Sequence, residues 1–216
     1  LFNGYQTDDL ITIISHVSQK YPSAKNKFLI GFSLGSMIAA QYGTDCNESD
    51  IDGIICISHS LQCAQGLSKI ETSLNRRLYY ETMMNTLKHL VKKSTFYSEE
   101  EKKAVMKTKR FREFDEIVTA KNMGLNHVSE YYDLLDLKPK VLKIKVPTLF
   151  ILAEDDPFTS PDWIPMEEIN KSDYVAFITT KEGGHVSFSQ GLNNKVSYSE
   201  EVSLDFCKCI SEIMQH

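Results

Sequence analysis

The sequence has no hydrophobic run long enough to cross a lipid bilayer. Its best candidate, Phe28 to Phe32, ends after five positions, whereas a membrane helix needs ~20 residues. Paired cysteines are also lacking, because the five cysteines are odd in number and include no C-x-x-C pair. These absences argue against a disulfide framework or a zinc site. Reduced thiols fit a cytosol-like compartment, so we expect a cytoplasmic protein.

An excess of positive charge is absent as well. The 24 lysines and arginines stand against 29 aspartates and glutamates, which gives a formal net charge of −5. The basic residues are scattered along the chain rather than gathered on one predicted face, so nucleic acid is not expected as a partner. Hydrophobic residues at 42% and charged residues at 25% are typical of a folded globular domain.

Short apolar runs are present in place of long ones. Four of them have the length and β-branched content of buried parallel strands, at 28–32, 51–57, 147–153 and 174–179. Helical patterns separate these runs, which indicates an α/β fold with a mainly parallel sheet. The tetrapeptide Ser197-Tyr198-Ser199-Glu200 has the form of a capping box and predicts a final helix.

A long stretch between the second and third runs has no strand signal. Apolar residues recur there at helical spacing, and we interpret residues 61–143 as an all-helical lid insertion. Residues 1–60 and 144–216 would then form the α/β core. We expect the insertion to cover the C-terminal ends of the strands and to influence substrate preference.

The motif Gly31-Phe32-Ser33-Leu34-Gly35 matches G-x-S-x-G. It lies where the first apolar run ends and a helix begins, which is the setting of a nucleophile elbow. Small neighbours allow the strained turn that exposes the Ser33 hydroxyl, and the Leu34 N–H at the helix N-terminus could donate to an oxyanion. The alternative is a glycine- and serine-rich turn without catalysis.

A serine nucleophile needs a base and an acid, which should follow it in the order acid, histidine. Asp155 and Asp156 follow the third run, and His185 follows the fourth. The C-terminal ends of parallel strands gather their loops at one edge of a sheet, so we expect Ser33, Asp156 and His185 to converge as a triad. Asp155 would either cap the loop or serve as an alternative acid. His59 either lines the site or occupies an ordinary loop.

These residues resemble the YheT-like, or abhydrolase-domain, group of α/β hydrolases, which includes embryogenesis-associated proteins, membrane-anchored lipases and alcohol acyltransferases. The resemblance spans nearly the whole chain and rests on the serine motif and on four further stretches, Phe111-Arg112-Glu113-Phe114-Asp115, Thr119-Ala120 with Gly124-Leu125, Tyr131-Tyr132 and Ala153-Glu154-Asp155-Asp156-Pro157-Phe158. Ser36 departs from the group, which often has a further glycine there. Ser58-His59-Ser60 lacks the proline that is common there.

The resemblance implies a serine hydrolase of lipid-like or simple carboxylic esters, without a metal or an organic cofactor. An alcohol acyltransferase on the same triad, or a non-catalytic hydrolase-like interaction protein, are the alternatives. A set of apolar side chains in the insertion could line an acyl pocket or simply pack its helices: Tyr79, Tyr80, Met83, Met84, Leu87, Phe111, Phe114, Tyr131 and Tyr132.

The resemblance also implies that the chain is the C-terminal half of an α/β hydrolase, with its first strands missing. The loop that supplies a second oxyanion N–H would precede Leu1, as would any membrane anchor typical of the group. Because losing one oxyanion donor costs ~10² to 10³ in rate, we expect this chain alone to be weakly active. The first strand, Phe28 to Phe32, would be an exposed apolar edge.

Overall fold

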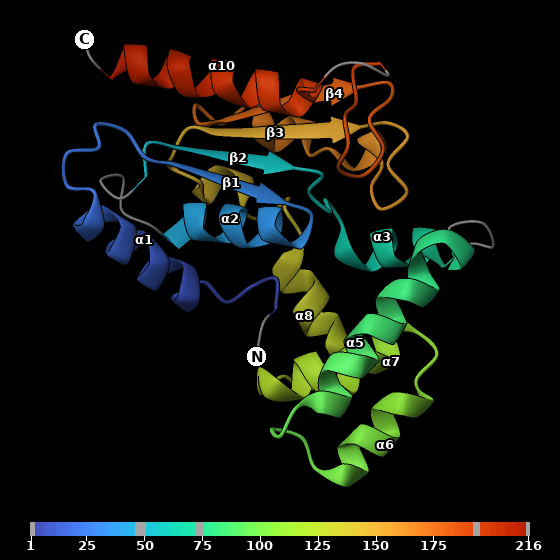
Figure 1. The fold of residues 1–216 in the computed structure, drawn as a ribbon. Helices are drawn as coiled ribbons and strands as arrows, with labels where there is room; N and C mark the ends of the chain where they lie inside the picture. The colour runs from blue at the N-terminus through green and yellow to red at the C-terminus, as the bar shows by residue number, and fades with distance from the viewer. Residues whose placement is uncertain (1–2, 46–50, 72–75, 192–194, 215–216) are drawn as a thin grey trace. The chain divides into compact units, whose positions relative to one another are not determined.

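The computed structural model describes residues 3–45, 51–71, 76–191 and 195–214 (Figure 1). The chain divides into two compact units. We call Gln62–Leu135 the helical unit and the remainder, Phe2–Leu61 with Asp136–His216, the sheet unit. No helix in the described ranges is both long and apolar enough to cross a membrane.

The sheet unit is built on four parallel strands, and this confirms the α/β fold class. The strands are paired in the order of the sequence, β1(Phe28–Phe32), β2(Gly53–Ile57), β3(Thr148–Ala153) and β4(Val175–Thr180). The register pairs Phe32 of β1 with Ile57 of β2, and Ala153 of β3 with Thr180 of β4. All four strands run the same way, so their C-terminal ends lie at one edge of the sheet.

Helices cover both faces of this sheet. In Figure 1, α1(Asp8–Lys20) and α2(Leu34–Asp45) lie on one side and α10(Tyr198–Ile213) on the other. Alternate residues of β2 supply the two cores, since Ile54 and Cys56 pack with α2 residues whereas Ile55 and Ile57 pack in the cluster that includes α10 residues. The period of two is what a strand covered on both faces requires. Two short segments, α9(Met166–Ile169) and η4(Pro161–Trp163), connect β3 to β4.

The predicted capping box begins the last helix. Ser197 Oγ accepts a hydrogen bond from the Glu200 N–H at 3.2 Å, and the Ser197 N–H donates to Glu200 Oε2 at 2.7 Å. These bonds satisfy backbone donors that the first turn of a helix leaves unpaired. The sequence therefore predicted this start correctly.

Strand β1 lies at one edge of the sheet, where it pairs with β2 alone among the described residues. Ile30 and Phe32 of β1 are each 46% exposed. The expected apolar edge is therefore present.

The helical unit contains no strand in the part that the structure describes. Its elements are α3(Cys63–Ile70), η1(Arg76–Tyr80), α5(Glu81–Lys93), α6(Glu99–Lys107), α7(Phe111–Asp115), η2(Glu116–Ala120) and α8(Val128–Leu135). The two ends of this excursion meet in the sheet unit, where the Leu137 N–H donates to the Leu61 carbonyl at 3.2 Å. Both leucines are fully buried. The short turn η3(Val141–Lys143) then leads into β3.

Most of the aromatic residues proposed for an acyl pocket are interior to the helical unit. The Tyr132 hydroxyl donates to Asp115 Oδ2 at 2.9 Å, and Thr119 Oγ1 donates to Asp115 Oδ1 at 2.7 Å. The buried set is Tyr80, Met84, Phe111, Phe114, Tyr131 and Tyr132. For these residues the packing alternative is correct, since none has more than a few per cent of its surface exposed.

His59, which follows β2, is fully buried in the sheet unit rather than placed on an accessible surface. Its ring meets the Phe150 ring edge-on, with 5.3 Å between centroids. Neither ring nitrogen has a hydrogen-bond partner of good geometry among the described residues. Burial is the main cause that lowers the pKa of His59 to about 3, and the nearby Lys140 charge lowers it further, against a small opposing effect of the Ser60 backbone. The folded protein therefore holds His59 neutral.

We expect this burial to make stability depend on pH. In the unfolded chain His59 titrates near 6.5, so between that pH and about 3 only the unfolded state binds the proton. The free energy of unfolding should therefore fall as pH is lowered through this window, by up to ~1.4 kcal/mol per pH unit. Chemical denaturation of the wild type and of His59→Leu over pH 7 to 4 measures this slope. Parallel profiles for the two proteins would contradict the assignment.

Candidate functional site

Ser33 lies in a sharp turn between β1 and α2. Its backbone adopts the left-handed conformation with φ of 51°, which is unfavourable for a residue with a side chain. The Ser33 N–H donates to the Ile57 carbonyl of β2 at 2.9 Å. The turn is therefore attached to the neighbouring strand immediately after the last residue of β1.

The two motif glycines have different reasons to be there. A Cβ on Gly31 would lie 2.3 Å from the Gly35 carbonyl oxygen, so any side chain would force the strand and the helix apart. A Cβ on Gly35 would meet no atom within 4 Å. The close approach expected from the motif therefore depends on Gly31.

Ser36, which stands where the related group often has glycine, reinforces the same turn. Its hydroxyl donates to the Ser33 carbonyl at 2.5 Å, and its own carbonyl accepts a hydrogen bond from the Cys56 thiol at 3.4 Å. Ser36 and Cys56 are both buried. The departure from the family pattern thus adds one hydrogen bond to the turn, that of the Ser36 hydroxyl, since the carbonyl would be present in glycine as well.

The structure brings Ser33, His185 and Asp156 together from the ends of three strands. His185 Nε2 lies 2.8 Å from Ser33 Oγ. On the other side of the ring, His185 Nδ1 lies 3.1 Å and 3.0 Å from the two carboxylate oxygens of Asp156. A carboxylate can only accept, so Nδ1 carries the proton and Nε2 is left to accept from the Ser33 hydroxyl.

The carboxylate that faces the ring is held away from solvent. The Asp156 side chain is fully buried, whereas 19% of the His185 side chain is exposed. The Phe158 N–H donates to Asp156 Oδ1 at 2.7 Å. This bond fixes the carboxylate orientation and leaves it able to accept from His185 as well.

Asp155 has a different partner. Its Oδ1 accepts a hydrogen bond from the Gly184 N–H at 2.8 Å. Gly184 adopts a φ of 61°, the left-handed region that favours glycine. Asp155 therefore fixes the backbone of the loop that carries His185, and it is Asp156 that contacts the imidazole.

Phe158 is a residue of the site that the sequence did not single out. Its ring covers the His185 ring with 4.2 Å between centroids and 32° between planes. The residue was part of the stretch that carried the family resemblance, but nothing in its spacing showed that it would pack against the histidine. Phe158 restricts the His185 ring through its face, while Asp156 restricts it through Nδ1.

Leu34 is the first residue of α2, so its N–H belongs to the helix N-terminus next to Ser33. The Leu34 side chain is 37% exposed.

Residues 3–45, 51–71, 76–191 and 195–214 include no group of three or more His, Cys, Asp or Glu side chains that could hold a metal ion. The arrangement can perform acid–base and nucleophilic chemistry with its own side chains.

The comparisons with known proteins agree with this description. The family model described as "Serine aminopeptidase, S33" matches residues 3–175. The human protein "Phospholipase ABHD3" is 30% identical over 214 residues, which are 95% of this chain and 51% of the relative. "Putative esterase YheT" of Escherichia coli is 26% identical over 88% of this chain and 57% of the relative. The chain therefore spans about half the length of the curated relatives it matches.

A solved structure supports the fold. The Pyrococcus furiosus esterase Pf2001 aligns over 100% of this chain and 64% of its own, with a TM-score of 0.53 and 12% sequence identity. At that identity the likeness concerns the fold alone. The expected resemblance to the YheT-like α/β hydrolases is confirmed, and the chain belongs to the α/β-hydrolase family described as serine aminopeptidase, S33.

Proposed function

We propose that the protein is a serine hydrolase of carboxylic esters with lipid-like acyl groups, in which Ser33 is the nucleophile, His185 the general base and Asp156 the orienting acid. The observation that carries the proposal is the unbroken chain of contacts from Ser33 Oγ through the His185 ring to the buried Asp156 carboxylate. Relatives named phospholipase and esterase support the ester class.

The first half of the reaction forms an acyl-enzyme. His185 Nε2 takes the Ser33 proton as Oγ attacks the ester carbonyl, and the carbonyl electrons move onto its oxygen. The Leu34 N–H donates to this oxyanion. As the tetrahedral intermediate collapses, the C–O bond to the alcohol breaks and His185 returns the proton to the departing alcohol oxygen.

The second half releases the acid. His185 takes a proton from a water molecule, the hydroxide oxygen attacks the acyl carbonyl, and the bond to Ser33 Oγ breaks as His185 reprotonates the serine. Throughout, Asp156 keeps the proton on Nδ1 and stabilises the imidazolium that forms. An alcohol in place of water would give a new ester by the same steps.

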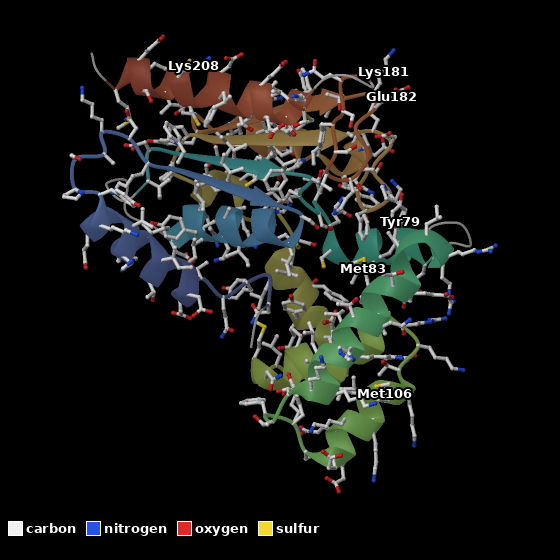
Figure 2. All side chains as sticks on the ribbon, in the orientation of Figure 1. Tyr79, Met83, Met106, Lys181, Glu182 and Lys208 are labelled. Carbon is white, nitrogen blue, oxygen red and sulfur yellow. The ribbon has the colours of Figure 1, made fainter. Side chains whose placement is uncertain are left out.

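The helical unit is proposed to supply the acyl-binding surface. Its aromatic interior is occupied by its own packing, but Tyr79 and Met83, both labelled in Figure 2, are 42% and 39% exposed. Tyr79, Met83 and the half-buried Leu87 are four residues apart in turn, so they share one stripe of η1 and α5. This stripe remains the candidate for contact with substrate.

The nucleophile assignment is tested by labelling. A fluorophosphonate, which phosphonylates activated serines, should label the wild-type protein, and Ser33→Ala should lose both the label and ester turnover. Without the nucleophile only ~10³ to 10⁴-fold acceleration over water is expected to persist. In-gel fluorescence and hydrolysis of a soluble p-nitrophenyl ester measure the two. Labelling that persists in Ser33→Ala would reject the proposal.

The two adjacent carboxylates provide a matched pair of variants. Asp156→Asn leaves an amide beside His185 and should favour the wrong tautomer, which lowers kcat by ~10⁴-fold. Asp155→Asn keeps an oxygen that can accept from the Gly184 N–H, so turnover should change by less than ~10-fold, since a neutral hydrogen bond contributes about 1 kcal/mol. Steady-state kinetics of both variants are the measurement, and similar losses in both would refute the division of roles.

The exposed stripe is tested by acyl chain length. Met83→Asp should lower kcat/KM for long-chain esters more than for short ones, because a carboxylate is costly to desolvate against an acyl chain. Met84→Asp is unsuitable, since Met84 is buried and a carboxylate there would destabilise the helical unit. Turnover of a series of p-nitrophenyl esters gives the ratio. An equal loss at every chain length would instead favour a packing role for Met83.

A further inference from the structure

Basic residues are not evenly scattered along the chain, which corrects the expectation stated for the sequence. Residues 76–112 hold eleven of the 24 lysines and arginines and only four glutamates, a net charge of +7. The whole chain carries −5, so the rest carries −12. This segment comprises η1, α5, α6 and the beginning of α7, all within the helical unit. Positive charge is therefore concentrated in one part of an acidic protein.

Helices α5 and α6 form an open hollow within this segment. It has a volume of about 480 Å³ and is lined by Lys92, Glu99, Lys102, Lys103, Met106 and Lys107. Met106, labelled in Figure 2, is 48% exposed. The hollow therefore combines four ammonium groups with one accessible apolar side chain.

The α5–α6 arrangement is fixed by a lysine that does not line the hollow. Lys88 of α5 donates from Nζ to the Thr108 carbonyl at 2.5 Å and to the Met106 carbonyl at 3.4 Å. Met106 lies in the last turn of α6 and Thr108 directly after it, where helix carbonyls lack partners within the helix. The bonds tie the end of α6 to α5 and so define one wall of the hollow.

Three of the four lining lysines keep their charge available. Lys102 pairs with Glu99 at 2.9 Å, and its side chain is only 19% exposed. Lys92, Lys103 and Lys107 are exposed, and none of them forms an ion pair with a carboxylate of the described residues. Three exposed cations that form no ion pair in the described residues, against the one Glu99 carboxylate of the lining, favour an external anionic partner.

We propose that this hollow, defined by Lys92, Lys103, Lys107 and Met106, docks the protein on an anionic phospholipid bilayer. Phosphate groups of the bilayer surface would meet the three free ammonium groups, and Met106 would contact the apolar part of the interface. The exposed Met106 side chain among the lysines fits a mixed lipid surface better than a nucleic acid. The functional role of this docking rests on the proposed function, because lipid-like esters reside in membranes.

Vesicle binding tests the docking surface independently of catalysis. The full protein is sedimented with vesicles of diether phosphatidylcholine, alone or mixed with diether phosphatidylglycerol, since these ether lipids have no carboxylic ester to hydrolyse. Binding should need phosphatidylglycerol and weaken as salt is raised. Each lysine near an anionic surface contributes ~5-fold to binding. A triple variant that combines Lys92→Glu, Lys103→Glu and Lys107→Glu should therefore weaken vesicle binding by at least ~100-fold.

A charge-matched control comes from the sheet unit. Lys20, Lys25 and Lys208 are exposed there, and their combined change to glutamate alters the net charge by the same amount. This control should retain vesicle binding. The corresponding glutamine variants of Lys92, Lys103 and Lys107 provide a milder change, and circular dichroism melting verifies that each variant is folded.

Several results would overturn the proposal. They are equal losses in both triple variants, binding to phosphatidylcholine alone, release by millimolar inorganic phosphate at constant ionic strength, or tighter binding to a DNA duplex than to the vesicles. Turnover of the soluble ester should be unchanged in the lysine variants. Ser33→Ala should still bind vesicles, so a failure of the proposed catalysis and a failure of docking give different outcomes.

Discussion

The close approach of Gly31 to the Gly35 carbonyl is the contact on which the geometry of the site depends. It allows β1 to pass into α2 through a single left-handed residue, and that residue is Ser33. The strain in this turn is offset by bonds that surround it, from the Ser33 N–H to β2 and from the Ser36 hydroxyl to the Ser33 carbonyl. A strained residue persists where its surroundings over-determine it.

The parallel sheet carries the constraint from the nucleophile to its partners. Because β1 to β4 are paired in sequence order, the residues that follow their ends arrive in a row at one edge. Two adjacent carboxylates then take separate tasks: Asp156 contacts the imidazole, and Asp155 holds the loop that delivers it. The position of the ring thus depends on its own hydrogen bonds, on the loop backbone and on Phe158.

Much of this could be predicted from the sequence, because it depends on local patterns. The four strands, the start of α10 and the order of Ser33, Asp156 and His185 follow from apolar runs, a capping box and parallel topology. Of the two roles expected for Asp155, the loop-capping one agrees with its bond to the Gly184 N–H. The role of Phe158 could not be predicted, since its contact with His185 depends on how the loops after β3 and β4 meet. The burial of His59 could not be predicted either, because the position of a polar residue after a strand does not indicate that its side chain will be fully buried.

The helical unit shows the same limit of sequence patterns. The spacing of apolar residues did not show that Met83 is exposed and Met84 buried. It also did not separate the aromatic residues that pack inward from those that do not. The stretches Phe111–Asp115 and Tyr131–Tyr132 carried the family resemblance, yet Phe111, Phe114, Tyr131 and Tyr132 are buried, and the Tyr132 hydroxyl donates to Asp115. A family signature can therefore mark the packing of a unit as readily as a site.

The hydrogen bond between Leu61 and Leu137 has a consequence for how such proteins diversify. The chain leaves the sheet after β2 and re-enters at β3, its immediate neighbour, and the two leucines close the base of that excursion. Lengthening a loop whose ends are already joined adds little closure entropy, because the cost grows only with the logarithm of its length. Recombination could therefore exchange the whole segment between homologues while every strand register is retained, so that specificity and scaffold can evolve at different rates.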